Sequence, residues 1–421
     1  MRSTRWITTA ITAPMADTDP LKRRSVLTGG AIAAAGASAG AIATLGAQAV
    51  TGRGDDQNTP ADAALHGEET IPFYGEHQAG ILTPLQAHGV FIALDLKDGI
   101  DRPALRRLMQ LLTDDASRLT QGRAPLADIE PELAATPARL TITIGFGPGF
   151  VEHADGVKPT WLAPLPAFRI DRLREEFSHG DLLLFIAGDD PLSIAHAQRL
   201  LLRDARTFAT VRWVQRGFRH ARSSVPGHET QRNLFGQIDG TVNPRPEDPE
   251  TASLIWVDDG TWMTGGTSLV LRRIAMDLET WDEVDRVGRE FAVGRKLDTG
   301  APLTGEKEHD APDFHAVTDR GFPVIDKASH MRRAVSTHPR ERILRRPFNY
   351  DDAPAEGEIS DTGLLFTAFQ ADITEQFLPI QQRLADADLL NQWTTPIGSA
   401  VFAIPPGCNE GGYLGQTLLE D

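Results

Sequence analysis

The chain has 421 residues, of which 41% are hydrophobic and 24% are charged. This composition is ordinary for a globular protein of one to three domains, with two as the central expectation. The formal net charge of −16 argues against a nucleic-acid or anionic-membrane surface, since either needs clustered Lys and Arg. The single cysteine, Cys408, excludes an intramolecular disulfide and a thiolate metal cluster, and we expect it to be a packed small side chain.

The N-terminal segment has the features of a targeting signal. Arg23 and Arg24 precede a weakly apolar run rich in Ala and Gly, which ends at the small-residue sequence Ala47-Gln-Ala49. Twin arginines followed by Ser-Val-Leu are typical of a Tat signal. A membrane-spanning helix is the alternative, but the run is poor in Leu and Ile.

We therefore predict a Tat signal peptide at 1–49 and a polar linker at 50–70, with Met1 or Met15 as the true start. The mature protein is expected to be periplasmic or extracellular and to have no stable membrane span. Tat substrates cross the membrane already folded, often with a cofactor inside.

Four segments share one pattern, in which an apolar run of strand length is followed by an Asp and a stretch of helical periodicity. Their strands are expected at 90–96, 182–190, 269–278 and 364–372. The helical stretches that follow them are expected at 103–119, 191–205, 279–291 and 373–385. The strand-end aspartates are Asp95, Asp189, Asp277 and Asp372. From Asp95 to Asp277 is 182 residues, and from Asp189 to Asp372 is 183 residues. This agreement suggests a duplicated half with two strand–helix units in each copy.

Further strands are expected at 139–146, 210–218 and 399–407, where apolar residues alternate with polar or small ones. Each half then reads β-α-β-β-α-β, which predicts an α+β protein of two ferredoxin-like halves. We place the first domain at 71–245 and the second at 246–421. The boundary falls where the sequence TVNPRPEDPETA interrupts regular structure.

The sequence NLFGQIDGTVNP contains Asp239 at this boundary, in an Asp-Gly pair. A structural interpretation is a turn, because Gly240 can adopt positive φ and Asp can bond its own backbone. A chemical interpretation is a carboxylate held close to a ligand by a turn that glycine defines. Crevices between domains are preferred ligand sites, which favours the second interpretation.

A second informative stretch, residues 326–352, contains His330, His338 and a dense set of arginines. In the strand-like sequence RILRRPF, Arg345 and Arg346 lie on opposite faces because side chains alternate. One of them can therefore face inward. An inward Arg, an inward Asp and a His without cysteines suit a heme pocket, since imidazole ligates iron.

These stretches, with several others, resemble the dye-decolorising (DyP-type) heme peroxidases, in the Tat-exported branch that includes the deferrochelatase/peroxidases of ferrous-iron uptake. The matching sequences span nearly the whole mature chain in the family's order. They are FYGEHQAGILTPLQ, TITIGFGPGF, FGQIDGT, GRKLDTGAPL, the Ser-His at His330, RILRR, LLFTAFQAD and AVFAIPPG. A bare G-x-x-D-G is a weak signal, whereas the ordered set is specific. Pro347 departs from the family, which usually has Gly there.

The resemblance implies a tandem ferredoxin-like fold of the dimeric α+β barrel type, with heme b between the distal turn and the C-terminal half. It implies that His330 is the proximal ligand of the heme iron, Asp239 the distal acid–base residue and Arg345 the distal arginine. The loop whose backbone lies against the heme matches Gly240, Thr241 and Val242. His338 remains the alternative proximal ligand.

Three other features have competing interpretations. Asp372 could accept a hydrogen bond from His330, but with Glu375 it also fits a helix-capping box. His77 is expected to be structural. The glycines of GFGPGF are not a dinucleotide fingerprint, because the spacing is wrong and Pro148 intervenes.

The expected reaction is reduction of hydrogen peroxide, with Asp239 as general base and then general acid and Arg345 stabilising the leaving oxygen. One-electron donors such as dyes or phenols are the partners, with iron-uptake components as further partners that the resemblance implies. One alternative is a deferrochelatase that releases iron and leaves the porphyrin intact. Another is a secreted heme-binding protein without turnover.

Overall fold

The computed structural model describes residues 66–226, 229–336 and 338–420. The predicted signal peptide and most of the predicted linker lie outside these residues, and the linker's last part includes a 3-10 turn, η1 (His66–Glu68). The described residues belong to one compact unit. Among the described helices, none combines the length and the apolar character needed to cross a bilayer.

The first half contains four antiparallel strands in the spatial order β2-β3-β1-β4. This is the ferredoxin-like order expected for β-α-β-β-α-β connectivity. Helix α1 follows β1 and helix α3 follows β3, and the two helices contact each other. The bounds are β1 (His88–Leu96), α1 (Arg102–Leu119), β2 (Thr141–Phe146), β3 (Leu182–Gly188), α3 (Pro191–Ala205) and β4 (Ala209–Phe218).

The second half repeats this arrangement, with the strand order β9-β5-β8-β7 and the short strand β6 also on β8. Its strands are β5 (Thr267–Met276), β6 (Leu344–Arg345), β7 (Phe348–Asp352), β8 (Asp361–Gln370) and β9 (Thr394–Ile404). The predicted continuous strand RILRRPF is wrong in one respect, since Arg346 and Pro347 separate β6 from β7.

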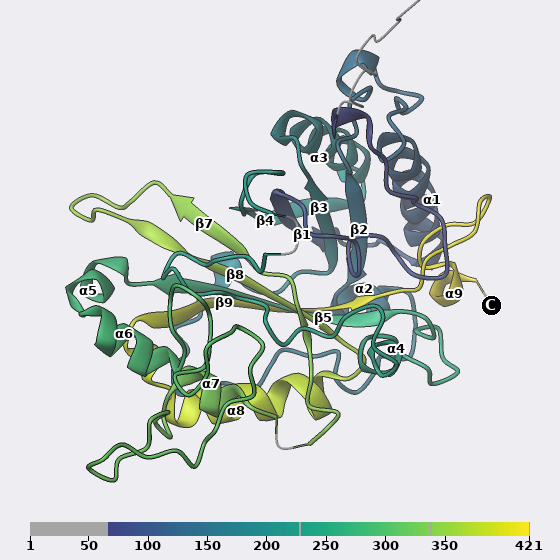
Figure 1. Ribbon diagram of the computed structural model, residues 1–421. Coiled ribbons are helices and arrows are strands. Elements are labelled where there is room, and N and C mark those ends of the chain that lie inside the picture. The colour runs from purple at the N-terminus through teal and green to yellow at the C-terminus, as the bar shows by residue number, and fades with distance from the viewer. Residues whose placement is uncertain (1–65, 227–228, 337, 421) are drawn as a thin grey trace, which may run out of the picture. The chain divides into compact units, whose positions relative to one another are not determined.

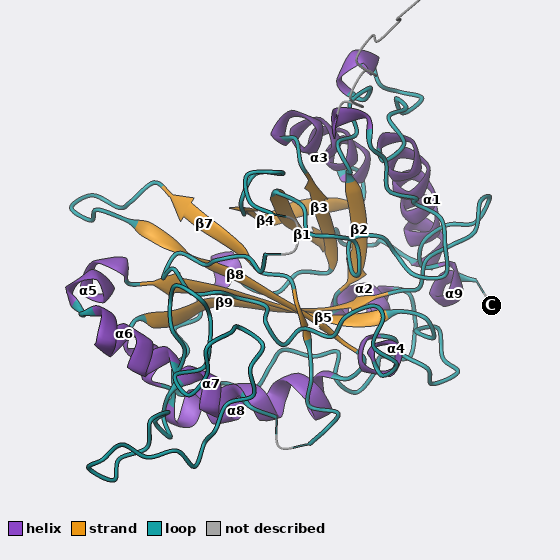
Figure 2. Cartoon of the chain, in the orientation of Figure 1, coloured by secondary structure: helices purple, strands orange, loops and turns teal. Residues whose placement is uncertain are grey.

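The two halves join edge to edge into one closed antiparallel barrel (Figures 1 and 2). Strand β2 meets β9 at Phe146 and Ala403, and strand β4 meets β7 at Phe218 and Asn349. The pairing of β5 with β8 completes the ring. The fold prediction of two ferredoxin-like α+β halves is therefore confirmed, and the closure adds hydrogen bonds that link the halves directly.

Aromatic and aliphatic side chains from both halves fill the barrel interior. The rings of Phe91 and Phe185 stack at 4.3 Å, and both meet Phe348 edge-on. Gly89 and Gly217 face each other across β1 and β4, beneath the Phe348 ring. A Cβ at Gly217 would lie 2.5 Å from the Cβ of Phe348, so the absence of a side chain lets β7 approach.

Aspartates cap several helices, and the strand-end aspartates of the two halves differ in this respect. Asp101 and Asp190 cap α1 and α3 by accepting backbone N–H bonds, instead of Asp95 and Asp189. In the second half, the strand-end Asp277 itself caps the helix that follows it. The predicted helix at 279–291 is two helices, α5 (Leu278–Glu283) and α6 (Arg286–Val293), because Asp285 starts a new cap.

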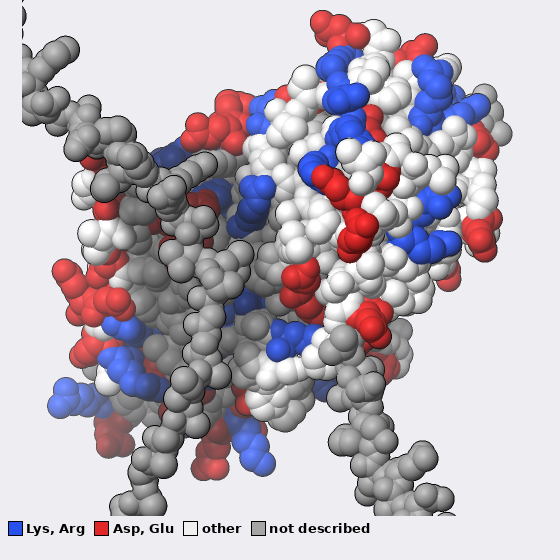
Figure 3. Space-filling view, turned by 90° about the horizontal axis from the view of Figure 1, so that it is seen from above, with Lys and Arg blue, Asp and Glu red and all other residues white. Residues whose placement is uncertain are grey.

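Near the C-terminus, a π-helical turn, η4 (Ile373–Phe377), leads into α8 (Leu378–Ala387). The shorter elements are η2 (Pro131–Leu133), α2 (Pro148–His153), η3 (Glu175–Phe177), α4 (Thr251–Ile255), α7 (His330–Ala334), η5 (Leu389–Gln392) and α9 (Gln416–Leu419). On the face drawn in Figure 3, acidic and basic side chains are intermixed, so that face offers no extended basic surface.

Candidate active site

The segment that carries Asp239 is a tight hairpin turn. Arg232 and Ile238 form an antiparallel bridge, and Gly236 turns the chain with a φ of +77°. The backbone N–H of Asp239 donates to the carbonyl of Gln231 at 2.8 Å. Gly240 follows with a φ of +133°, a conformation that residues with a Cβ rarely adopt. The glycines thus set the direction in which Asp239 points.

Asp239 and Arg345 form an ion pair in which Arg345 Nη1 donates to Asp239 Oδ1 at 2.7 Å. The Asp239 side chain is 6% exposed and that of Arg345 is 23% exposed. The amide side chain of Asn243 fixes the backbone of Arg345, since its Oδ1 accepts from the Arg345 N–H at 3.0 Å and its Nδ2 donates to the Arg345 carbonyl at 2.7 Å. The distal turn therefore holds both the carboxylate and its guanidinium partner.

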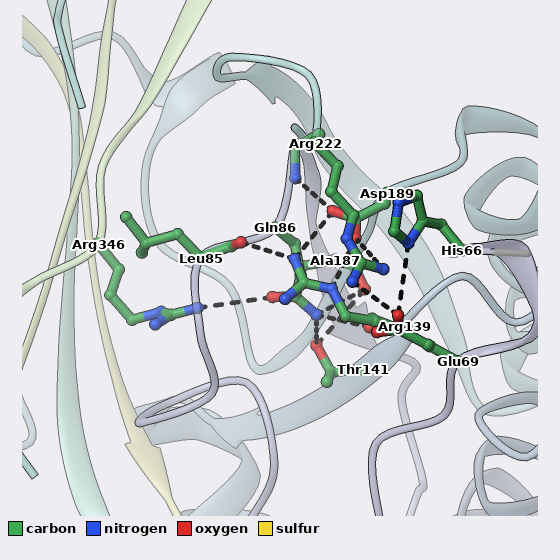
Figure 4. A network of polar contacts seen from close by, with 11 residues as sticks. His66, Glu69, Leu85, Gln86, Arg139, Thr141, Ala187, Asp189, Arg222 and Arg346 are labelled. Carbon is green, nitrogen blue, oxygen red and sulfur yellow. Dashed lines mark hydrogen bonds and ion pairs between the residues drawn. The ribbon is translucent and has the colours of Figure 1, made fainter. Parts of the chain in front are cut away.

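Arg346 points to the other side of the chain. Its guanidinium donates to the carbonyl of Thr83 and to the side-chain oxygen of Gln86. Figure 4 shows the Gln86 contact within a polar network that continues to Arg139 and Asp189. Burial and the charge of Arg139 lower the pKa of Arg346 to about 10. The expected alternation is thus present, with Arg345 as the arginine that faces Asp239.

His330 lies at the start of α7 and contacts a carboxylate that the sequence did not reveal. Its Nδ1 donates to Asp388 Oδ2 at 2.6 Å, because a carboxylate only accepts. Burial of the ring opposes its protonation, but the Asp388 charge outweighs this and raises the pKa of His330. Asp388 Oδ1 accepts from the backbone N–H of Leu390 at 2.9 Å, which fixes the carboxylate.

One cavity of about 500 Å³ brings these groups together. Asp239, Arg345, His330 and Asp388 all line it, and so do Thr241 and Val242 of the predicted contact loop. Gly240 is not among the lining residues and acts through its backbone conformation. Apolar side chains from β5, β8, η4 and α8 form much of the wall: Ile274, Met276, Leu364, Phe366, Phe377 and Leu384. The cavity lies outside the barrel, since Leu365 between Leu364 and Phe366 packs in the barrel interior.

The remaining candidate residues lie elsewhere. His338 is exposed and does not line the cavity. His77 Nδ1 donates to the carbonyl of Gly265 at 2.7 Å, and the ring stacks on Trp256, as expected of a structural histidine. Asp372 caps η4 by accepting from the N–H groups of Thr374 and Glu375, so the capping interpretation is the one that the geometry supports. Cys408 is buried, and burial raises the pKa of its thiol to about 11.

Asp388 is the residue that the sequence did not indicate. A local signal existed, because an Asp before Leu389 at the start of a short helix is a capping pattern. Its proximity to His330, 58 residues earlier, depends on the packing of α7 against α8.

The residues present fit a heme. His330 has one ring nitrogen tied to a carboxylate and the other free for a metal, the arrangement that metal-ligating histidines usually show. The Thr241 hydroxyl is buried in the cavity wall and has no hydrogen-bond partner among the described residues. Apolar walls with few polar groups are typical of cofactor sites.

A ferredoxin-like pair closed into a barrel, with this donor set on its outer face, defines a heme-dependent peroxidase. Family models for the Dyp-type peroxidases match the chain twice, the N-terminal model at residues 78–219 and the C-terminal model at residues 230–409. The chain belongs to the Dyp-type peroxidase family.

Named relatives agree with this assignment. A dye-decolorizing peroxidase from Thermobifida fusca is 36% identical over 82% of this chain and 84% of its own length. A deferrochelatase from Yersinia pseudotuberculosis is 33% identical over 95% of both chains. The crystal structure of a DyP-type peroxidase from Cellulomonas bogoriensis superposes with a TM-score of 0.83 and 52% identity, covering 85% of this chain and 100% of that chain.

Proposed function

We propose that this chain uses heme b to reduce hydrogen peroxide to water while it oxidises one-electron donors, with Asp239 and Arg345 as its catalytic residues. The observation that carries the proposal is the 2.7 Å pair of Asp239 and Arg345, which lines the same cavity as His330. Bound heme would supply an iron centre that changes oxidation state reversibly. Each peroxide consumes two donors, as H₂O₂ and two AH give two H₂O and two A•.

The position of each residue in the cavity determines its proposed role. His330 would hold the iron through Nε2, because Nδ1 is occupied by Asp388. The backbone of Gly240, Thr241 and Val242 would lie against the porphyrin. Asp239 removes the proton from one peroxide oxygen and returns it to the other, as a general base and then a general acid. The Arg345 guanidinium stabilises the negative charge that develops on the departing oxygen.

Replacement of Asp239 tests this assignment. We expect Asp239→Asn to bind heme with an unchanged Soret spectrum and to react with peroxide about 10²- to 10⁴-fold more slowly, as for loss of a general acid–base group. Stopped-flow absorption after mixing with peroxide gives the rate. Asp319→Asn, an exposed aspartate outside the cavity, is the matched control. Full peroxide reactivity in Asp239→Asn would instead favour a heme-binding protein without turnover.

The deferrochelatase relatives support a second candidate function, release of iron from heme with the porphyrin intact. Both functions would use the cavity that His330 and Asp239 line. Incubating the heme-loaded protein under reducing conditions and recording metal-free porphyrin fluorescence distinguishes them. A stoichiometric rise in that fluorescence supports iron release, and a constant baseline leaves peroxide reduction as the function.

We also propose that the chain is exported by the Tat route. The support is the sequence at 1–49, with Arg23 and Arg24 before an Ala- and Gly-rich run. Replacing both arginines by lysine is expected to retain the protein in the cytoplasm, as judged by fractionation. Export of the double-lysine variant at the normal level would contradict the proposal.

A further inference from the structure

A second, smaller cavity of about 360 Å³ lies beside α7. Six residues line it, and we call it the basic pocket: Phe314, Lys327, Arg332, Arg333, Val335 and Arg383. Four of them are cationic, two are apolar and none is acidic. Its volume falls at the small end of the range for small-molecule sites, about 300–1,000 Å³.

The basic pocket adjoins the main cavity. Val335 lines both of them, directly after the end of α7 (His330–Ala334). The same short helix presents His330 to the main cavity and Arg332 and Arg333 to the basic pocket. A molecule in the basic pocket would therefore sit one residue layer from the cavity that holds the catalytic groups.

The positive charge of the basic pocket is largely unbalanced. Arg332 Nη1 donates to the Ile325 carbonyl at 2.8 Å, and Arg333 Nε donates to the Arg383 carbonyl at 3.0 Å, so both use neutral acceptors. Among the described residues, neither of them nor Lys327 forms an ion pair with a carboxylate.

Arg383 is balanced in part. Its Nη1 pairs with Glu341 at 2.8 Å, but its buried Nη2 has no hydrogen-bond partner among the described residues. A buried donor without a partner is destabilising, which points to an anionic or hydrogen-bonding ligand. Such a concentration of cations in a chain with a net charge of −16 contrasts with the mixed charges of the face in Figure 3.

The wall of the pocket also suits a flat ring. The guanidinium carbon of Arg332 lies 5.2 Å from the centroid of the Phe314 ring, within cation–π range. Guanidinium planes and an aromatic ring both stack on aromatic ligands. The remaining cations would then meet the charged group of the ligand.

We propose that the basic pocket binds an aromatic anion, an aryl sulfonate or aryl carboxylate, and that this is where anionic electron donors dock. The proposal rests on the proposed peroxidase function for its second part. A phenolic donor bound there loses one electron and one proton to become a phenoxyl radical, and two such donors convert one H₂O₂ into two H₂O.

Calorimetry tests the binding part without turnover. Titrating the heme-loaded protein with naphthalenesulfonate is expected to show saturable binding that weakens at high salt, because the contact is electrostatic. Lys327→Glu, which reverses a charge at the pocket, should weaken it at least about fivefold. Arg107→Glu, on the exposed face of α1 and far from α7 in Figure 1, is the matched control. Equal affinity for methanesulfonate, or no effect of Lys327→Glu, would overturn the proposal.

Steady-state kinetics test the donor part with two phenols of similar electron demand. For para-hydroxybenzenesulfonate, Lys327→Glu and Arg332→Gln should raise KM by about fivefold or more and leave kcat within about twofold. For the neutral para-(methylsulfonyl)phenol, KM should not change. Parallel changes for both phenols would show a disturbed cavity and contradict the docking role. If neither phenol is oxidised by the wild type, the proposed function fails, while the calorimetric result still decides whether the anion site exists.

Discussion

The contact of His330 with Asp388 shows what single residues in this sequence could and could not indicate. The capping role of Asp372 follows from a local pattern, since its side chain bonds backbone N–H groups two and three residues later. The pairing of Asp388 with His330 does not, because it exists only when α8 and η5 pack beside α7. The sequence therefore indicates His330 as a candidate ligand, whereas its contact with Asp388 becomes visible only in the folded structure.

Removing the negative charge of Asp388 should lower the affinity of the protein for heme. We expect Asp388→Asn to reduce heme affinity about 10- to 100-fold, as for other partners of metal-ligating histidines. Asp372→Asn is the matched control, because Asn caps a helix about as well as Asp, and it should leave heme affinity unchanged. Heme titration followed at the Soret band measures both variants. Equal heme affinity in Asp388→Asn and the wild type would exclude this role.

Substitutions of the neighbouring Arg345 and Arg346 should have different effects, one on the peroxide reaction and the other on stability. Arg345→Leu removes the guanidinium that faces Asp239 and should slow the peroxide reaction about 10²-fold or more. Arg346→Leu removes a group that contacts only the Thr83 and Gln86 side of the chain. Its peroxide rate should stay within about threefold of wild type, and its effect should appear in the midpoint of thermal unfolding. The reverse order of kinetic effects would show that the inward arginine is misassigned.

At the scale of elements, most strands and helices follow from apolar periodicity. The helix expected at 191–205 coincides with α3, and the strand at 210–218 differs from β4 by one residue. The errors occur where a second capping residue or a proline intervenes, at Asp285 and Pro347. Periodicity records which face is buried, and it does not record where the backbone changes direction.

The contact between α1 and α3 should make the stability of the protein depend on pH. Asp115 of α1 is buried against Asp204 of α3, and burial together with that neighbouring carboxyl raises the pKa of Asp115 to about 7. The folded state then holds a proton that the unfolded state has released above its ordinary pKa of 3.8. Stability should therefore fall as pH rises from about 4 to about 7, by about 1–2 kcal/mol for this residue after allowance for solvent screening.

Urea unfolding at about pH 5 and about pH 8 checks this dependence. The Asp115→Asn variant keeps an uncharged group at every pH, so its stability relative to wild type should increase between the two conditions. Asp319→Asn, an exposed aspartate outside α1 and α3, should show no such trend. A constant difference between Asp115→Asn and wild type would mean that Asp115 does not titrate in this range.

At the scale of the whole molecule, two halves were predicted and one barrel is found. The repeat in the sequence indicates equivalent units, because each half buries one face of its own sheet. It does not indicate that β2 pairs with β9 and β4 with β7, since those contacts are single register points between distant strands. The boundary proposed near residue 245 remains a prediction.

Closure of the barrel depends on small residues beneath Phe348. Gly217→Ala would bring a Cβ to 2.9 Å from the Asn349 carbonyl oxygen and closer still to Phe348. We expect a loss of about 1–3 kcal/mol, typical of an overpacked core. Gly75→Ala is the control, since a Cβ there meets its nearest atom at 3.8 Å. Denaturant unfolding should show one shifted transition for Gly217→Ala, and an unchanged midpoint would mean that β7 can move away without loss.

The side-chain amide of Asn243 has a consequence for how the sheet ends. Strand β6 pairs with β8 on one side only, and an unpaired strand edge invites other chains to add to it. At Arg345 that edge is already occupied, because Asn243 takes the place of a neighbouring strand and satisfies both the N–H and the carbonyl of that residue. A single amide therefore covers this edge at Arg345 and, by the same two hydrogen bonds, joins strand β6 to the turn that carries Asp239.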